Sequence, residues 1–159
     1  MTNRVGIGLD VHAFDESRPL TLGGVTIEGH HGLAGHSDAD VVCHAVIDAL
    51  LGAAALGDLG RHFPGDARWK DASSIEMLTE AVRLLADAGW APNNVDITIV
   101  AQTPRLAPHG ASIATTLARA MEMETGNVSV KSTTTDGLGF VGRNEGIAAL
   151  AVATIRPLT

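Results

Sequence analysis

The chain has 159 residues, a length typical of one domain, and its 45% hydrophobic content excludes an intrinsically disordered protein. The formal net charge of -7 argues against a general nucleic-acid binder, and the single cysteine, Cys43, excludes an intrachain disulfide. Neither a signal peptide nor an uninterrupted apolar segment of membrane-spanning length is found, so we expect a single cytoplasmic domain over residues 1–159 without a nucleic-acid or membrane partner.

The N-terminal part predicts two strands followed by a long helix. Residues Arg4–His12 alternate as a strand does, and Leu20–Ile27 is a second strand region that a Gly-Gly pair breaks into a hairpin. We expect a helix from Asp38 to about Leu56, with Ser37 as its N-cap and Asp40 three residues later, as in a capping box. An irregular loop over residues 57–71 follows.

The second part alternates helices and strands. Ser73 and Glu76 predict another capping box, and the helix that they open ends at Gly89. After it we expect, in order, a strand over Asp96–Ala101, a helix over about His109–Glu124, and strands over Val128–Thr135 and Gly146–Ile155. The last strand is apolar on both faces, which is typical of a central strand or of one covered by another subunit.

This order of elements predicts an α+β fold, an α/β sandwich in which a mixed four- to five-stranded sheet carries helices on one face. The other face of the sheet would then require a partner. The pattern therefore favours oligomerisation.

A set of polar residues falls in segments that otherwise read as buried. Side chains alternate along a strand, so Asp10 and His12 share one face of the first strand. His44 lies in the apolar helix, flanked one turn away on either side by Asp40 and Asp48. Metal ligation is one way to satisfy such groups, and Asp10, His12 and His44 are a suitable set for a catalytic zinc with one open position. Asp40 and Asp48 would orient the ring of His44, or alternatively cap helices or pair with surface cations.

Two further segments predict anion binding. His36 and Ser37 lie at a helix N-terminus, which favours a phosphate, although Ser37 also serves as an N-cap. A strand then ends in hydroxyls and a carboxylate that suit a phosphate and a hard cation, although threonines are also ordinary strand residues: Thr133, Thr134, Thr135 and Asp136. No Walker loop, dinucleotide fingerprint, C-x-x-C or nucleophile elbow is present.

At these positions the chain resembles the 2-C-methyl-D-erythritol 2,4-cyclodiphosphate synthase family of the non-mevalonate (MEP) route to isoprenoids. The resemblance runs essentially end to end. It is carried by six segments: Gly8–His12, His36–Asp40, Asp48–Gly60, Phe63–Pro64, Asn94–Asp96 and Thr133–Gly146.

The resemblance implies a homotrimer with active sites between neighbouring subunits. It implies zinc held by Asp10, His12 and His44, and a second divalent ion, Mg²⁺ or Mn²⁺, held with the substrate diphosphate by Asp136. His36 and Thr134 would be the catalytic residues that stabilise the transition state by hydrogen bonds.

The resemblance also implies the residues that bind substrate. Asp58 and Gly60 would contact the ribose, and Phe63 and Asp66 belong to the loop beside them. The cytosine pocket would be lined by Ala101, Thr103, Pro104, Arg105 and Leu106. Phe140 and Arg143 would face the trimer axis, where relatives have a cavity for an isoprenoid diphosphate, and Arg143 would pair with Glu145 when nothing is bound.

The implied substrate is 4-diphosphocytidyl-2-C-methyl-D-erythritol 2-phosphate. Its own 2-phosphate would attack the β-phosphorus and release CMP, as in a phosphorus–oxygen lyase. Two other interpretations are a metal-dependent nucleotide-diphosphate hydrolase and a non-catalytic trimer that binds zinc or an isoprenoid diphosphate. The combination of metal ligands with Thr134 and Asp136 argues against a carrier.

Overall fold

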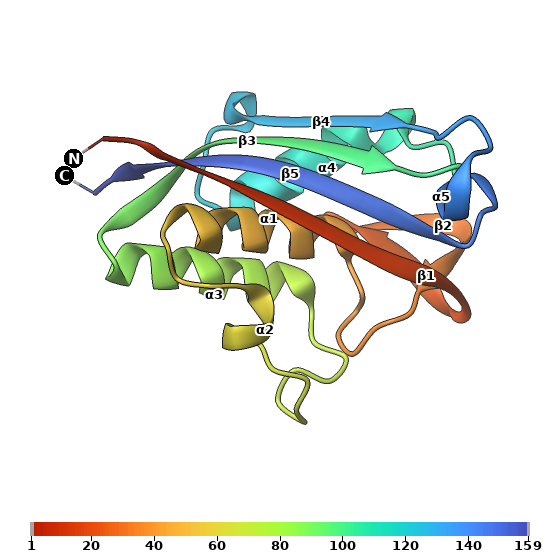
Figure 1. Ribbon diagram of the computed structural model, residues 1–159, viewed down its shortest axis with the longest axis horizontal. Helices are drawn as coiled ribbons and strands as arrows, with labels where there is room; N and C mark the ends of the chain where they lie inside the picture. Colours follow the sequence, from red (N-terminus) through yellow and green to blue (C-terminus); the bar gives the residue numbers. More distant parts are fainter. Residues whose placement is uncertain (1, 159) are drawn as a thin grey trace.

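A computed structural model describes residues 2–158 of the chain (Figure 1). Five strands form one sheet in the order β2-β1-β5-β3-β4, in which β3 and β4 are parallel and the other neighbours antiparallel. The strands are β1 (Arg4–Leu22), β2 (Val25–Leu33), β3 (Trp90–Val100), β4 (Val128–Thr133) and β5 (Gly146–Pro157). The predicted mixed sheet is confirmed, and β5 is its central strand.

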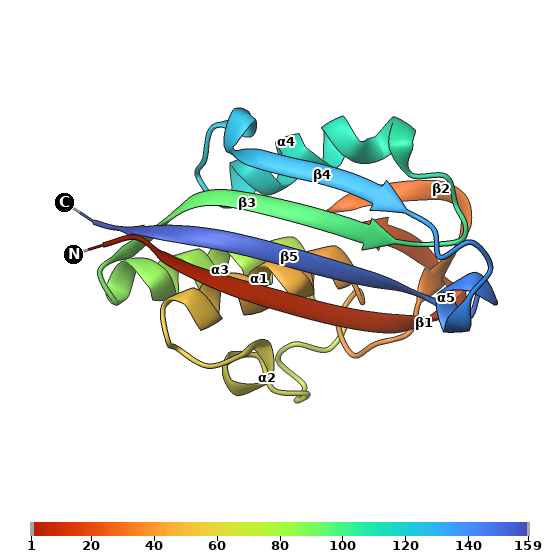
Figure 2. The ribbon, with the colours of Figure 1, turned by 45° about the horizontal axis from the view of Figure 1, so that its top comes forward.

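Three helices cover one face of this sheet: α1 (Val41–Ala53), α3 (Ser74–Asp87) and α4 (Gly110–Ala120) (Figures 1 and 2). The connections contain the short helices α2 (Leu59–His62) and α5 (Gly139–Gly142) and the 3-10 turns η1 (Ala107–His109) and η2 (Thr125–Asn127). Within residues 2–158, none of the helices combines the length and apolar character that crossing a bilayer would require.

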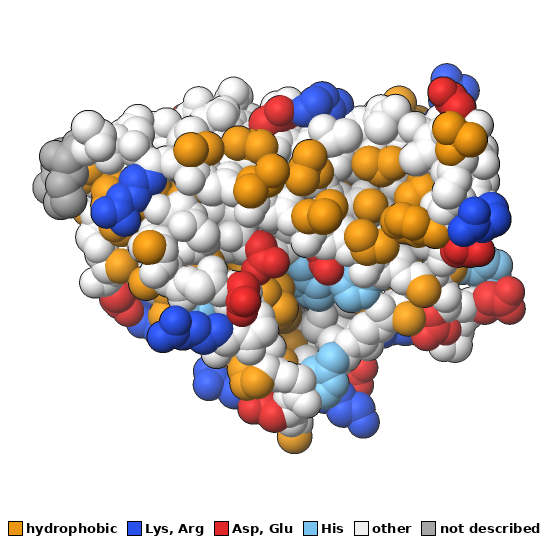
Figure 3. Space-filling view, viewed as in Figure 1, with side chains coloured by type: hydrophobic (Ala, Val, Ile, Leu, Met, Phe, Trp, Pro, Cys, Tyr) orange, Lys and Arg blue, Asp and Glu red, His pale blue; other side chains and the backbone are white. Residues whose placement is uncertain are grey.

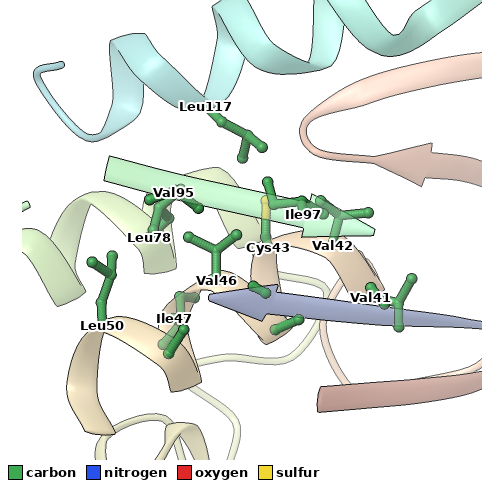
Figure 4. Close-up of a cluster of buried hydrophobic side chains, with 14 of the residues drawn as sticks. Val41, Val42, Cys43, Val46, Ile47, Leu50, Leu78, Val95, Ile97 and Leu117 are labelled. Carbon is green, nitrogen blue, oxygen red and sulfur yellow. The ribbon is translucent and has the colours of Figure 1, made fainter. Parts of the chain in front are cut away.

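The core lies between the sheet and these helices. Val46 and Leu50 of α1 meet Leu78 of α3, Ile97 of β3 and Leu117 of α4, and all five side chains are fully buried (Figure 4). Aliphatic side chains dominate this core because the chain contains few aromatic residues. Each such side chain contributes roughly 1.5–3 kcal/mol by leaving water.

The backbones of β1 and α1 pack very closely. A Cβ built on Gly8 would lie 1.9 Å from the carbonyl oxygen of Ala45, and one built on Gly6 would lie 2.1 Å from that of Ala49. Helix and strand backbones therefore touch with no side chain between them. This contact fixes the height of α1 above the strand.

The side chains that alternate with these glycines along β1 point to the opposite face of the sheet. Val5, Ile7 and Leu9 are 66%, 67% and 64% exposed, and Leu150 and Val152 of β5 extend the same surface. Figure 3 shows this apolar band across the strands. The predicted alternation along β1 is thus confirmed, and the face that was expected to need a partner is open in the single chain.

The start of α1 differs from the prediction. The helix begins at Val41 rather than Asp38, and its N-cap is Asp40 rather than Ser37, because Ala39 adopts a φ of 58° that no right-handed helix accepts. The Asp40 carboxylate accepts the amide N–H groups of Val42 and Cys43, and also those of Gly23 and Gly24 in the β1–β2 turn. A single buried carboxylate thus joins the hairpin to the helix.

The boundaries of other elements differ from the prediction as well. β1 continues through the gap expected between the first two strands, because residues up to Leu22 pair with β2. Ser73 is the N-cap of α3, but its side chain makes no capping hydrogen bond, so the predicted capping box is wrong. The carboxylate of Asp38 accepts the Ser74 N–H instead, at 2.9 Å.

We expect Gly8→Ala to lower the free energy of unfolding by roughly 3 kcal/mol or more, because the added methyl group meets the backbone of α1. Gly52→Ala is the matched control, since a Cβ there meets nothing within 4 Å and alanine favours a helix by about 0.5–1 kcal/mol. Urea unfolding followed by circular dichroism measures both. Equal stability of the two variants would contradict the close-packing interpretation.

Candidate active site

Three predicted ligands converge at the sheet face below α1. Nε2 of His12 lies 2.8 Å from Oδ2 of Asp10 and 3.2 Å from Nδ1 of His44, and that Nδ1 lies 3.1 Å from the same carboxylate oxygen. One ligand atom from each residue falls within 4.8 Å of the others. Histidine and acidic side chains meet in a hollow beneath the strands in Figure 3. One carboxylate oxygen and two imidazole nitrogens suit a divalent metal ion with an open position.

The remaining ring nitrogens have partners that suit ligation. Nδ1 of His12 contacts the carbonyl oxygen of Ala34 at 2.5 Å, and a carbonyl can only accept. Nε2 of His44 lies 3.1 Å from Oγ of Ser37 and 3.0 Å from Oγ of Ser74. Both rings are thus held from behind, while a nitrogen of each faces Asp10.

The three groups also adjust one another's ionisation. Burial opposes ionisation of Asp10, but its side-chain contacts with His12 and His44 outweigh this effect and lower the pKa of the carboxyl to about 2. Burial also opposes protonation of His12, yet the hydrogen bond and charge of Asp10 raise the pKa of that ring. The ionised carboxylate of Asp10 therefore gives the site a negative charge, which attracts either a proton or a cation.

A pocket of about 270 Å³ opens beside these ligands, and its further lining includes His36, Ser37, Phe63 and Trp69. His36 is exposed, and its Nε2 donates to the carbonyl oxygen of Asp66 at 2.6 Å. The pocket thus has a polar wall at the ligands and an apolar wall, where Phe63 packs edge-on against Trp69 at 4.8 Å between ring centroids.

Asp40 and Asp48 were predicted to orient the ring of His44, but neither side chain forms a hydrogen bond with it. The Asp40 carboxylate is committed to backbone amides, and Asp48 accepts the N–H of Leu59 at 2.7 Å. Burial raises the pKa of the Asp48 carboxyl. The structure thus shows the alternative that the sequence left open, in which Asp40 and Asp48 cap helices. The ring of His44 contacts Ser37 and Ser74 instead.

The predicted cytosine-pocket residues lie together in a second cavity of about 340 Å³. Its wall contains Ala101, Thr103, Pro104, Arg105 and Leu106, with Gln102, Ala107, Ser132, Thr133 and Thr134. At its edge the Thr134 hydroxyl donates to Asp136 at 3.2 Å and accepts the N–H of Asp136 at 3.1 Å. The side chain of Gln102 binds the N–H of Gly137 and so ties the two loops together.

The two pockets are far apart within one chain. Asp10 lies on β1 and Thr133 ends β4, and β5 and β3 lie between these strands. Three strand spacings amount to about 14 Å. The ligand cluster and Thr134 therefore do not form one site in the isolated chain.

The remaining predicted residues are exposed, except Thr135, which is half-buried. Asp58 is the N-cap of α2, which contains Gly60, and Thr135 donates to the carbonyl of Leu138 at 2.6 Å. Phe140 is on α5, and Arg143 pairs with Glu145 at 3.0 Å, which confirms that predicted ion pair.

Sequence reasoning missed Ser74, Trp69 and Met77, which all contribute to the surroundings of the ligand cluster. Ser74 was hidden because Ser73 and Glu76 gave a sufficient local explanation for the start of α3. Its contacts with Asp38 and His44 span 36 and 30 residues. No local pattern signals contacts of that kind.

Comparisons with known proteins agree with this geometry. A family model described as the YgbB family matches residues 3–156. A Salinibacter ruber protein named 2-C-methyl-D-erythritol 2,4-cyclodiphosphate synthase is 57% identical over 154 residues, covering 96% of this chain and 98% of the relative.

Two solved structures are also similar. The bifunctional IspDF of Campylobacter jejuni matches with a TM-score of 0.95 and 40% identity, over 99% of this chain and 43% of that longer chain. The Plasmodium falciparum IspF in a CDP complex matches with a TM-score of 0.85 and 31% identity, over 99% of this chain and 97% of that one.

We expect Zn²⁺, used as the probe ion, to raise the melting temperature of the wild-type protein, because an ion that binds the folded state alone stabilises it. At a free concentration roughly 100 times the dissociation constant, the gain is about 2.7 kcal/mol. His44→Ala should abolish the shift, whereas His30→Ala, an exposed histidine outside the cluster, should keep it. An equal shift in the His44 variant would place the ion elsewhere.

Proposed function

We infer the function of this chain from the fact that it belongs to the YgbB family, whose model matches nearly its whole length. The chain is an enzyme of the non-mevalonate isoprenoid pathway that forms 2-C-methyl-D-erythritol 2,4-cyclodiphosphate. The observation that carries this conclusion is the 57% identity to a synthase of that name, with 98% of the relative covered. Neither the hydrolase nor the carrier interpretation has similar support.

The reaction itself is an internal phosphoryl transfer. An oxygen of the substrate's 2-phosphate attacks the β-phosphorus of the cytidine diphosphate group, a new phosphorus–oxygen bond closes the ring, and the bond to CMP breaks. No water is consumed, which makes the enzyme a phosphorus–oxygen lyase. Because the substrate carries its own nucleophile, the chain needs none, in agreement with the absence of a nucleophile motif from its sequence.

Asp10, His12 and His44 would hold a zinc ion, and Asp136 would help to hold Mg²⁺ or Mn²⁺ with the diphosphate. Divalent ions supply positive charge that reduces the repulsion between two anionic phosphates. The fit of the triad to zinc is supported by its one-oxygen, two-nitrogen donor set and by the outer hydrogen bonds of both rings.

His36 and Thr134 would be the catalytic residues of this chain, donating hydrogen bonds to charge that develops on the phosphates. Ser37 offers a hydroxyl beside the ligand cluster, and Thr133 and Thr135 flank Thr134. Asp58 and Gly60 contact the ribose, and Phe63 and Asp66 belong to the substrate-binding loop beside them. Phe63 lines the first pocket together with Leu59, which Asp58 precedes at the start of α2, and this supports the assignment.

The second pocket is the cytosine site. Its lining from Ala101 to Leu106 offers backbone donors and acceptors, which suit the hydrogen-bonding edge of a base. A binding site for the nucleotide is also supported by the CDP complex of the Plasmodium falciparum relative.

The assembly is a homotrimer in the cytoplasm. Joining chains across the open apolar face of β1 and β5 would bring the ligand cluster of one subunit to the Thr134 loop of the next, which one chain alone keeps about 14 Å apart. Phe140 and Arg143 would then lie toward the axis, where an isoprenoid diphosphate could displace Glu145 from Arg143.

Phosphorus-31 NMR with the cytidine-diphospho substrate and Mg²⁺ tests the reaction. We expect paired, coupled resonances of a cyclic diphosphate together with CMP. Chelation of the metal should stop the reaction, and added zinc should restore it. Linear phosphates with CMP would instead identify a hydrolase, and no turnover with metal present would favour a carrier.

A mixture of two inactive variants tests the shared site. His44→Ala and Thr134→Ala chains should each be inactive alone. Co-expressed, they should regain roughly a quarter of the wild-type activity, because mixed trimers contain some interfaces with both intact halves. Persistent inactivity of the mixture, with trimers verified by size, would place both residues in one chain's own site.

A further inference from the structure

The outer nitrogen of His44 faces two linked polar residues, Ser74 and Asp38, that the proposed reaction does not use. Ser74 is fully buried, and its Oγ lies 3.0 Å from Nε2 of His44. Behind Ser74 lies the carboxylate of Asp38. We propose that Asp38 and Ser74 are positioning residues that hold His44 with its proton on Nε2, so that Nδ1 presents a lone pair to the metal ion. This inference rests on the metal site proposed above.

The first step concerns the proton of the Ser74 hydroxyl. The Asp38 carboxylate accepts the Ser74 N–H at 2.9 Å and the Asp40 N–H at 3.2 Å, and it also accepts the hydroxyl of Ser74. An ionised carboxylate has no hydrogen to give. The single hydroxyl proton of Ser74 is therefore directed at Asp38.

The second step concerns the histidine. Since the Ser74 hydroxyl donates its hydrogen bond to Asp38, its oxygen can only accept in the contact with Nε2 of His44. That nitrogen must then carry a hydrogen. In a neutral imidazole the other nitrogen bears the lone pair, and Nδ1 is the atom that lies 3.1 Å from Asp10 and 3.2 Å from His12.

Ser37 does not make this selection. Its hydroxyl lies 3.1 Å from the same Nε2, but a hydroxyl without a committed proton can either donate to a ring nitrogen or accept from one. Ser74 differs from Ser37 because of Asp38. The selection of the tautomer therefore depends on the pair of Asp38 and Ser74.

Burial makes the selection strong. His44 is 8% exposed and Ser74 is 0% exposed, so water does not compete for the contact. When a cation lies between Nδ1 and Asp10, the opposite tautomer would place a proton on the ligating atom and set two acceptors, Nε2 and the Ser74 oxygen, against each other behind the ring. Outer partners of this kind are generally worth 10–100-fold in metal affinity.

The same residues also hold the start of α3, so the experiment must separate positioning from stability. Ser74→Ala is compared with Ser73→Ala, the neighbouring serine whose side chain makes no capping hydrogen bond. Zinc affinity is measured by competition with a chromophoric chelator, and the unfolding of each metal-free variant by urea. We expect Ser74→Ala to weaken zinc binding about tenfold or more and Ser73→Ala to leave it unchanged.

Proton NMR of the zinc-loaded proteins gives a second measurement, which does not depend on the stability of the variants. In the wild type and Ser73→Ala, the Nε2 proton of His44 should give a downfield resonance that exchanges slowly with water, and in Ser74→Ala this resonance should be lost. If Ser74→Ala does not fold, Asp38→Asn serves instead. Its amide can donate to Ser74 and release that hydroxyl toward Nε2, so zinc affinity should again fall.

Equal zinc affinity of Ser74→Ala and Ser73→Ala, or equal losses in both, would overturn the positioning role while leaving the proposed function intact. Failure of the wild type to bind zinc at all would overturn the metal site and this role together. Zinc-independent turnover in the same preparation would then show that the synthase activity survives without either.

Discussion

The contact that the rest of the structure depends on is the one between the backbones of β1 and α1. Because Gly6 and Gly8 carry no side chain, the carbonyls of Ala49 and Ala45 rest directly on the strand. His44 precedes Ala45 by one residue, so the depth of this contact sets how far its ring reaches toward β1. Two residues beyond Gly8 the strand presents Asp10, and then His12. Substitution of a larger residue in the strand would lift the helix and carry Nδ1 of His44 away from the carboxylate.

That close approach buries polar atoms, and the structure satisfies them from both sides. On the inner side, one ligand atom each from Asp10, His12 and His44 lies within 4.8 Å of the others. Facing outward, the ring nitrogens reach the carbonyl of Ala34 and the hydroxyls of Ser37 and Ser74. Throughout residues 2–158, no buried side-chain nitrogen or oxygen lacks a hydrogen-bond partner. The inner atoms are thereby kept in place by contacts that ligand binding does not disturb, which is the condition for a preorganised site.

Periodicity was sufficient to predict the sheet, its helical layer and the cluster of three candidate ligands, because alternation along β1 and the position of His44 in an apolar helix are local signals. The start of α1 was misplaced, because Asp40 caps the helix only where Ala39 turns the backbone into the left-handed region. Ser74 was missed because its partner Asp38 lies 36 residues away. The association of Thr134 with the ligand cluster could not be predicted from a single chain, because three strand spacings separate them. It was suggested by the family resemblance alone.

The ligands of the cluster come from two distant parts of the chain, with the whole β1–β2 hairpin between them. His12 and His44 are 32 residues apart in sequence. An ion held by both would close that loop much as a disulfide does, and loops of this length restrict the denatured chain by roughly 3–4 kcal/mol of conformational entropy at room temperature. In this protein, which has no disulfide, a catalytic ion would therefore double as the crosslink that ties the hairpin to the first helix.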